Sequence, residues 1–289
     1  MNPTLAALAA ITIFSLGTLL YVLALEVPVY QFLAMKFAIG GLSIMAFDKL
    51  RGRNVLKEWR QPIKSYLLVG AAFGLYNFFL VQAFHLSPAF EVNILNYLWP
   101  ILIAVFAVLI GGEKLSKLTF VSIALGFAGA ILIFLPNDPD NIFANLAAGH
   151  VLAIAGAILW AFYSVSSRKH NYKAGFLAPV MLLVATCFAI LHLAFEEFYK
   201  PDMALWMIIV LAGITRFCYV LWDYAIRNGH RMSLSALSYL TPLLSTLLFI
   251  AFDYKPASPY VALGGALIIG GCLVASAPRF WAAIRKRRA

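Results

Sequence analysis

The sequence predicts an all-α integral membrane protein, with ten transmembrane helices arranged as two inverted five-helix repeats and both termini in the cytoplasm. The prediction rests on an apolar composition, on basic residues that gather in alternate loops, and on a repeat between the two halves. Of 289 residues, 63% are hydrophobic and 12% are charged, whereas an ordinary soluble domain carries about 25% charged residues. Lipid is therefore the expected environment of most of the chain.

Ten apolar stretches follow one another along the chain, separated by short polar or proline-containing breaks. Roughly 20 apolar helical residues cross a hydrocarbon core about 30 Å thick, and each stretch approaches that length. We expect the first stretch to stay in the protein as a span and not to be cleaved as a signal peptide. The predicted spans, numbered in order, cover residues 4–25, 29–47, 63–84, 92–110, 118–135, 147–166, 176–195, 205–226, 233–252 and 260–277.

Basic residues gather in every second break between these spans. If the N-terminus is inside, the cytoplasmic breaks and the C-terminal tail hold nearly all of the 22 lysines and arginines. The exceptions are Lys200 and Lys255 in the other breaks, and Lys36 and Arg216 within spans. The positive-inside rule therefore predicts two cytoplasmic termini. The same distribution explains the net charge of +10 without a nucleic-acid partner.

The two halves of the chain resemble each other when one is shifted by 142 residues. Residues 94–102 then align with residues 236–244, and both segments contain Tyr-Leu-x-Pro. We predict a first five-helix repeat over residues 1–146, and a second, inverted repeat over residues 147–289 that ends in a basic cytoplasmic tail. An odd number of helices makes the second copy enter the membrane from the opposite side, as in many secondary transporters that work by alternating access.

Spans four and nine each carry one polar face with the i, i+3/i+4, i+7 spacing of a helix. Polar side chains at mid-depth are costly against lipid, so we expect both faces to line a shared cavity; hydrogen bonding between helices is the alternative. The two stripes are Asn93, Asn96, Tyr97 and Pro100 in span four, and Ser235, Ser238, Tyr239 and Pro242 in span nine.

Pro100 and Pro242 are candidate hinges. Each proline removes one backbone hydrogen bond and clashes with the preceding turn, so half a helix could swing around the kink. The alternative is a proline that is merely tolerated in a membrane helix.

Span eight is the most polar of the ten, with Arg216, Tyr219, Asp223 and Arg227 on one stripe. Arg216 and Asp223 are separated by about 10 Å of helix rise, so each needs another partner. Lys36 and Glu91 are the candidates for those ion pairs. Alternatively, a zwitterionic substrate offers a carboxylate to Arg216 and an ammonium to Asp223.

Aromatic side chains make up 15% of the chain, and many fall deep within the spans. An apolar pocket with stacking faces and a few polar groups suits an aromatic or bulky apolar solute with a charged end; ordinary packing is the alternative. The deep aromatic residues are Tyr76, Tyr97, Trp99, Trp160, Tyr163, Tyr219, Trp222 and Tyr239.

Cysteines and glycines in the spans point to structural roles. Cys187, Cys218 and Cys272 have apolar neighbours, so we expect buried thiols and no disulfide, metal site or cofactor. Small residues in spans five and ten permit close helix approach, which predicts a scaffold and a contact for a homodimer. These small residues include Gly126, Gly129, Gly270 and Gly271.

Together these features resemble the EamA-type branch of the drug/metabolite transporter superfamily, over nearly the whole chain. Within that branch the chain is similar to bacterial exporters of aromatic amino acids. The resemblance implies a multi-pass protein of the bacterial inner (plasma) membrane that exports aromatic amino acids or related amphipathic metabolites through a central cavity. The motifs that carry it are Glu91-Val92, Asn96 to Pro100, Trp160 to Tyr163, Tyr219 with Trp222, and Ser238 to Pro242.

The stripes and the resemblance together predict a substrate site but no catalytic residue. The chain departs from the family pattern at Asn77, where an acid is expected, and at Asp223, where an amide is expected. The predicted substrate-binding residues are Tyr76, Asn77, Asn93, Asn96, Tyr97, Trp99, Trp160, Tyr163, Arg216, Tyr219, Trp222, Asp223, Ser238 and Tyr239.

Three other functions compete with amino acid export. A broader drug or organic-cation exporter of the same superfamily would use Asp223 or Glu91 as its cation or proton site. A passive channel would need a charged ring or a carbonyl filter motif, and a membrane-embedded enzyme would need a nucleophile with a nearby base or metal-ligand spacing. The sequence shows neither. The expected partners are a small-molecule substrate and the lipid bilayer.

Overall fold

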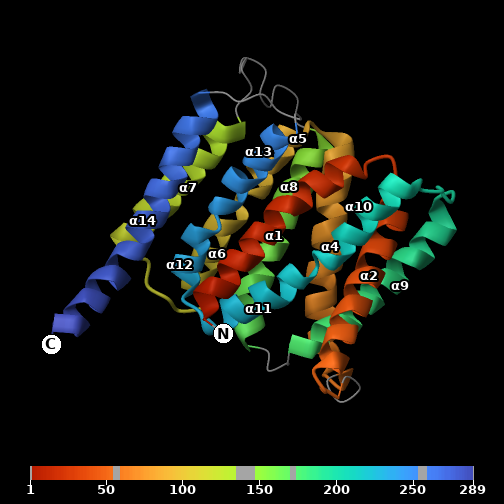
Figure 1. The fold of residues 1–289 in the computed structure, drawn as a ribbon, viewed down its shortest axis with the longest axis horizontal. Helices are drawn as coiled ribbons and strands as arrows, with labels where there is room; N and C mark the ends of the chain where they lie inside the picture. The colour runs from red at the N-terminus through yellow and green to blue at the C-terminus, as the bar shows by residue number, and fades with distance from the viewer. Residues whose placement is uncertain (1, 55–58, 135–146, 170–173, 253–258, 289) are drawn as a thin grey trace.

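Long apolar stretches, interrupted at prolines and polar breaks, fold into helices throughout the chain (Figure 1). The computed structural model describes residues 2–54, 59–134, 147–169, 174–252 and 259–288, and no strand occurs within these ranges. The α-helices are α1 Pro3–Leu23, α2 Val29–Leu50, α4 Ile63–Leu86, α5 Ala89–Asn96, α6 Trp99–Leu109, α7 Lys117–Phe134, α8 Ala148–Ser166, α9 Leu177–Phe195, α10 Met203–Ile214, α11 Phe217–Asn228, α12 Arg231–Leu237, α13 Leu240–Ala251 and α14 Pro259–Arg288.

Within the described ranges, eight helical segments are long and apolar enough to cross a membrane. Two further apolar helices, Lys117–Leu132 and Pro259–Val274, are shorter. The all-helical membrane fold is thus confirmed, whereas the count of ten spans stays a prediction. The eight segments are Pro3–Leu23, Val29–Leu50, Ile63–Leu86, Glu91–Leu109, Ala148–Ser166, Leu177–Phe195, Met203–Asn228 and Arg231–Ala251.

Spans four and nine are interrupted next to their prolines. Span four breaks between α5 and α6, at Tyr97 and Leu98, and Pro100 lies in the first turn of α6. Span nine breaks between α12 and α13, at Ser238 and Tyr239, just before Pro242. The predicted kinks are therefore present, at equivalent places in the two halves.

Span eight is interrupted as well, which the sequence did not predict. The expected single helix over residues 205–226 is divided into α10 and α11 at Thr215 and Arg216. Both side chains donate hydrogen bonds to the carbonyl of Ala212, Thr215 Oγ1 at 2.8 Å and Arg216 Nε at 3.1 Å. These bonds compete with the backbone ladder, so the helix is interrupted where Arg216 enters the bundle.

Helix α1 lies in the middle of the bundle and packs against α10, α11 and α13, while α2 packs against α9 and α4 against α8 (Figure 1). At one side α7 and α14 form a separate close pair. A Cβ on Gly129 would lie 2.5 Å from the Gly264 carbonyl, and one on Gly271 would lie 2.7 Å from the Ser122 carbonyl. These two glycines bring the helices together, as predicted, whereas Gly270 faces open space.

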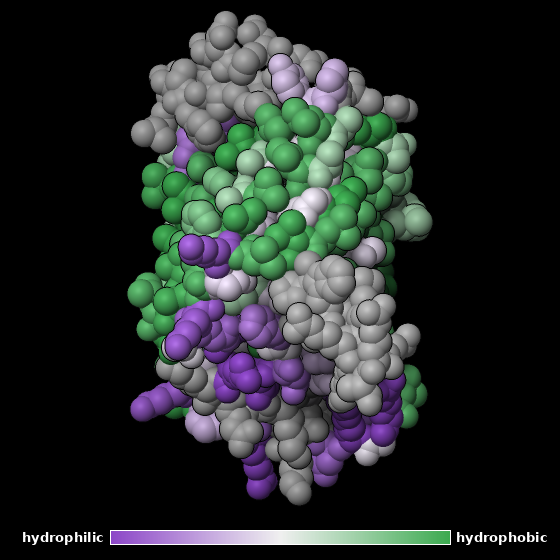
Figure 2. Space-filling view, turned by 90° about the vertical axis from the view of Figure 1, so that its left-hand side faces the viewer, coloured by the Kyte–Doolittle hydropathy of each residue, from purple (hydrophilic) through white to green (hydrophobic). Residues whose placement is uncertain are grey.

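The outer surface of the bundle is largely apolar. Figure 2 shows the side on which α7 and α14 lie, with hydrophobic residues across its upper and middle part and hydrophilic residues gathered below. Cys187, expected to be buried, is exposed on α9. A thiol on the lipid-facing side of a helix is not covered by protein. Apolar neighbours in the sequence do not distinguish a side chain that faces lipid from one that is buried in protein.

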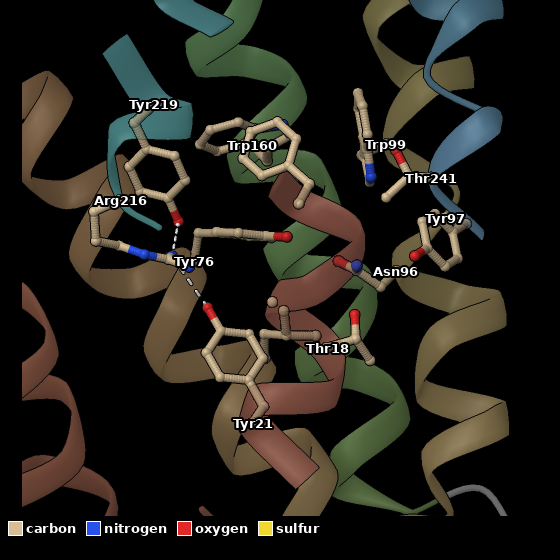
Figure 3. A pocket seen from close by; sticks show the side chains of 13 residues that line it. Thr18, Tyr21, Tyr76, Asn96, Tyr97, Trp99, Trp160, Arg216, Tyr219 and Thr241 are labelled. Carbon is tan, nitrogen blue, oxygen red and sulfur yellow. Dashed lines mark hydrogen bonds between the residues drawn. The ribbon is translucent and has the colours of Figure 1, made fainter. Parts of the chain in front are cut away.

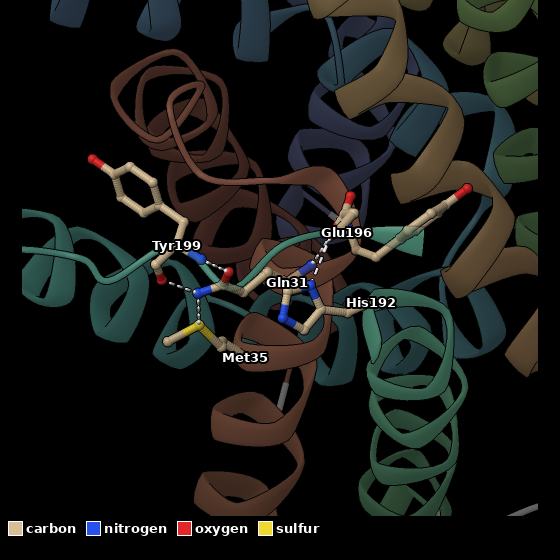
Figure 4. A network of polar contacts seen from close by, with 6 residues as sticks. Gln31, Met35, His192, Glu196 and Tyr199 are labelled. Carbon is tan, nitrogen blue, oxygen red and sulfur yellow. Dashed lines mark hydrogen bonds and ion pairs between the residues drawn. The ribbon is translucent and has the colours of Figure 1, made fainter. Parts of the chain in front are cut away.

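A polar network holds the start of α2 against the segment after α9 (Figure 4). The carboxylate of Glu196 accepts the backbone N–H groups of Tyr30 and Gln31 at 2.9 and 3.0 Å, and it contacts His192 Nδ1 at 3.0 Å. Gln31 in turn bonds the backbone of Tyr199 in both directions. Because an acid at a helix N-terminus satisfies free N–H groups, Glu196 fixes one end of α2.

Candidate functional site

A cavity of about 40 Å³ lies at the centre of the bundle, bounded by α1, α4, α8 and the three interrupted spans (Figure 3). The junction of span four contributes Tyr97, and the junction of span eight contributes Arg216. Irregular backbone at membrane depth is stable only where it is buried in protein or lines a cavity. The lining residues are Phe14, Gly17, Thr18, Tyr21, Tyr76, Leu80, Asn96, Tyr97, Trp99, Trp160, Arg216, Tyr219 and Thr241.

Trp160 on α8 is the centre of the aromatic wall. Its ring centroid lies 5.1 Å from those of Tyr76 and Tyr219, and 5.8 Å from that of Phe14 at a right angle. Tilted and edge contacts of this kind are the preferred geometry of aromatic pairs. The cavity therefore offers ring faces and edges to a solute.

A cationic cluster adjoins the aromatic wall and consists of Lys36, Arg216, Asn77, Tyr21 and Tyr219, of which Arg216, Tyr21 and Tyr219 line the cavity. Lys36 Nζ and Arg216 Nη1 both donate to Asn77 Oδ1, at 3.0 and 3.3 Å. Arg216 Nη1 also donates to Tyr219 OH at 2.9 Å. Two basic side chains thus share neutral acceptors beside the cavity.

The acids of spans four and eight are paired elsewhere. Asp223 accepts a hydrogen bond from Tyr163 OH at 2.9 Å and pairs with Arg227 at 3.4 Å. Glu91 pairs with His150 at the start of α8. The expected ion pairs with Lys36 and Glu91 are therefore wrong, because the chain folds Lys36 beside Arg216 and gives Glu91 a histidine.

Two polar atoms on the remaining wall have no hydrogen-bond partner among the described residues. They are Asn96 Oδ1 and Thr241 Oγ1, both buried and both in cavity-lining residues. A buried acceptor without a partner is costly, so these oxygens are available to a polar group on a solute.

Half of the predicted site residues line the cavity: Tyr76, Asn96, Tyr97, Trp99, Trp160, Arg216 and Tyr219. Asn77 lies in the cationic cluster. Trp222 lies behind the aromatic wall, and its Nε1 donates a hydrogen bond to Ser164 Oγ. The others bond or pack away from the cavity: Tyr163 to Asp223, Asn93 to the Ala89 carbonyl, Ser238 to the Leu234 carbonyl, and the Tyr239 ring beside Gly126.

Helix α1 supplies lining residues that the sequence analysis missed. Phe14, Gly17, Thr18 and Tyr21 all face the cavity, with Leu80 and Thr241 from other helices. The α1 residues have the same i, i+3/i+4, i+7 spacing that marked spans four and nine. That spacing was a usable signal, although a single threonine and tyrosine are weak evidence in a membrane helix.

Polar contacts hold α12 against its neighbours at the end of the bundle where α12 begins, here called the α12 end. Arg231 Nε contacts Glu113 Oε1 at 2.5 Å, and Arg231 Nη1 donates to the Val165 carbonyl at 3.2 Å. Ser235, one turn further into α12, donates to the Pro100 carbonyl. These contacts join α12 to α6, α8 and the segment after α6.

Apolar spans, three of them interrupted around a buried aromatic and cationic cavity, define a multi-pass membrane transporter. The model of the EamA-like transporter family matches residues 2–135 and again residues 147–277. The chain belongs to the EamA-like transporter family. Membership places it among transporters and not enzymes.

Three named relatives match between 78% and 95% of the chain. The chain is 32% identical over 284 residues to the aromatic amino acid exporter YddG of Ancylobacter novellus, across 95% of this chain and 97% of that protein. It is 28% identical over 243 residues to the protein of the same name from Escherichia coli K12, across 78% and 80%. The uncharacterized inner membrane transporter YedA of E. coli K12 is 26% identical over 258 residues, across 85% and 81%.

A solved structure has the same fold. A protein crystal structure with 31% sequence identity superposes with a TM-score of 0.85, covering 95% of this chain and 96% of the other. The overall arrangement of the helices is therefore shared with an experimental structure.

Proposed function

We propose that this protein exports aromatic amino acids or related amphipathic metabolites from the cytoplasm by alternating access. The observation that carries the proposal is the central cavity, which is lined by aromatic rings and, next to them, by the guanidinium of Arg216. An aromatic amino acid has the matching parts, a ring and a charged end. Two relatives, both named as aromatic amino acid exporters, support the same substrates.

The proposed topology has ten spans and two cytoplasmic termini. The apolar helices Lys117–Leu132 and Pro259–Val274 would serve as spans five and ten. Hydrophilic residues gather toward one end of the bundle in Figure 2, the end at which the N-terminus lies in Figure 1. The α12 end is then the cytoplasmic face, in agreement with the positive-inside rule.

Equivalent positions of the two proposed repeats meet at the cavity. Asn77 and Tyr219 are exactly one repeat apart, 142 residues, and Asn77 Nδ2 donates to Tyr219 OH at 2.8 Å. Thr18 and Trp160 are equivalent under the same shift, and both line the cavity. Positions related by a twofold axis contact each other only near that axis. This supports a substrate site at the repeat interface, as in other inverted-repeat transporters.

The cavity must enlarge before it can hold an amino acid. Its volume of about 40 Å³ is far below the roughly 300–1,000 Å³ of sites for small molecules. The interrupted spans border the cavity, so movement of their half-helices would widen it toward one face of the membrane. This is the motion that alternating access requires.

The charge of the cavity wall disfavours the organic-cation exporter. Arg216 lines the cavity, whereas Asp223 and Glu91 do not. Asp223 is paired with Arg227, and Glu91 is paired with His150. A cation would therefore meet a positive wall without a balancing acid. Anionic and zwitterionic solutes fit the site better.

Counterflow in liposomes tests the proposal. Liposomes that contain the purified protein are loaded with unlabelled phenylalanine and diluted into a trace of labelled phenylalanine. We expect transient accumulation of label, absent from protein-free liposomes and from liposomes loaded with glycine. Accumulation of a labelled lipophilic cation, but not of phenylalanine, would contradict the proposal.

Pro100→Ala and Pro242→Ala should slow counterflow more than they lower the amount of folded protein. Because alanine favours an uninterrupted helix by up to about 3 kcal/mol relative to proline, we expect the rate to fall by roughly tenfold or more. Pro179→Ala, in the first turn of α9, is the matched control. Parallel losses of rate and protein level would show that the two prolines are structural and not hinges.

A further inference from the structure

Two basic side chains are buried around one amide oxygen beside the cavity. Lys36 is 0% exposed and Arg216 is 3% exposed. Both donate to Asn77 Oδ1, which also accepts a hydrogen bond from Tyr21 OH at 2.7 Å. Among the residues that the structure describes, no carboxylate forms an ion pair with Lys36 or Arg216.

Neutral acceptors do not balance these two charges. The Lys36 ammonium lies 4.4 Å from the centre of the Tyr21 ring, and the Arg216 guanidinium lies 4.9 Å from that of Tyr219. Such contacts offset only part of the cost of taking a cation out of water. Charged groups within a membrane normally pair with an opposite charge and mark a substrate pathway.

The amide of Asn77 is held in one orientation. Its Nδ2 donates to the Phe73 carbonyl and to Tyr219 OH, both at 2.8 Å. Its Oδ1 is therefore fixed toward the two cations, where an aspartate would place a negative charge. Asparagine is neutral, so a negative charge at this point must come from another molecule.

The cluster can be reached from the cavity. Arg216, Tyr21 and Tyr219 all line it, and Trp160 lies next to Tyr219. Figure 3 shows the Arg216 side chain between the Tyr219 and Tyr21 hydroxyls, with Trp160 above. A solute with its ring on Trp160 would have its acidic end within reach of Arg216.

We propose that Lys36, Arg216 and Asn77 form a receptor for the carboxylate of the transported solute. The carboxylate binds the Arg216 guanidinium and accepts hydrogen bonds that Lys36 and Arg216 now donate to Asn77 Oδ1. Its negative charge is the one that the cluster lacks. This inference rests on the proposed function and narrows it: the substrates are aromatic solutes that carry a carboxylate, and a solute without one binds poorly.

Competition against labelled phenylalanine in wild-type liposomes tests the receptor without any substitution. N-acetylphenylalanine keeps the carboxylate and loses the ammonium, whereas phenylalaninamide loses the carboxylate. Since a hydrogen bond to a charged group contributes about 1.5–3 kcal/mol, we expect phenylalaninamide to compete about tenfold or more weakly than phenylalanine. N-acetylphenylalanine should compete better than phenylalaninamide. Equal competition by phenylalanine and phenylalaninamide would overturn the proposal.

Asn77→Asp is the sharpest variant, because it adds a negative charge with almost no change in shape. The aspartate should neutralise the two cations and weaken phenylalanine competition by about tenfold or more, while phenylalaninamide is affected little or improved. Asn228→Asp makes the same change on an exposed residue of α11 and should leave both values unchanged. An unaltered ratio between the two competitors in Asn77→Asp would refute the receptor.

The outcomes separate this inference from the proposed function. If wild-type protein does not accumulate phenylalanine, the proposed function fails and the receptor fails with it. If phenylalanine is transported but phenylalaninamide competes equally, only the receptor is wrong. If Asn77→Asp does not fold, the wild-type competition decides alone.

Discussion

Arg231→Met should open the α12 end of the bundle and shift the protein toward a state accessible from the cytoplasm. Arg231 is buried and joins Glu113 to the Val165 carbonyl, so its loss removes the charged contact that holds α12 against its neighbours. Because Glu113 is partly exposed, we expect a shift of about 1–3 kcal/mol, or roughly 5- to 150-fold in the ratio of the two states.

Thiol labelling measures this shift. Ser235, buried on α12 one turn inside Arg231, is replaced by cysteine in a chain from which the three native cysteines have been removed. A membrane-impermeant maleimide added on the cytoplasmic side should label this cysteine faster in the Arg231→Met background. Equal labelling rates in the two backgrounds would show that Arg231 does not hold the α12 end closed.

Exchanging the charges of Arg231 and Glu113 distinguishes the contribution of their ion pair from that of the packing of Arg231. Glu113→Arg and Arg231→Glu should each speed the labelling, and the combined variant should restore part of the slow rate. Such a cycle isolates the interaction between the two residues. Additive effects of the two single exchanges would assign the closure to packing alone.

The sequence does not encode a second copy of the Arg231–Glu113 ion pair. A shift of 142 residues places Glu113 on Lys255 and Arg231 on Ala89, which are not an acid and a base in matching positions. The opposite face carries a different contact, between Glu91 and His150. If the protein works by the proposed alternating access, two faces held by different interactions have different closing energies, and we expect unequal populations of its inward-open and outward-open states.

Most helix positions could be predicted from the sequence because the lipid environment imposes a minimum apolar length. Span six was expected over residues 147–166 and is Ala148–Ser166; span seven was expected over 176–195 and is Leu177–Phe195. The interruption of span eight was not predictable in this way. It depends on side-chain bonds from Thr215 and Arg216 to a single carbonyl, and hydropathy does not record such bonds.

The candidate site was predictable where polarity is unusual for a membrane helix. Arg216 and Asn96 were identified because arginine and asparagine are costly in lipid. The lining residues of α1 and the true neighbour of Lys36 were not identified, because helical periodicity gives the face of one helix and not the helix opposite. For that reason Lys36 was expected beside an acid, whereas the fold places it beside Arg216 and gives the cavity a basic wall.

Trp160→Leu should remove the preference for aromatic solutes while the protein stays folded. Trp160 contacts Tyr76, Tyr219 and Phe14 and is central to the aromatic wall. Leucine keeps an apolar side chain of moderate size, whereas alanine at a buried tryptophan would cost about 3–5 kcal/mol of stability. Loss of the ring contact between Trp160 and the solute, worth about 0.5–1.5 kcal/mol, should reduce phenylalanine counterflow by roughly 2- to 12-fold.

The measurement compares labelled phenylalanine with labelled leucine, both in counterflow. Both solutes carry the same charged end, so the ratio of their rates reports the aromatic contact alone. Trp160→Phe should keep most of the preference, and Trp206→Leu, which changes a tryptophan that is 41% exposed on α10, should keep all of it. If Trp160→Leu lowered both rates equally, Trp160 would support the structure of the cavity without recognising the ring. A selective loss for phenylalanine requires a ring-binding contact at Trp160, since the carboxylate receptor is unchanged in that variant.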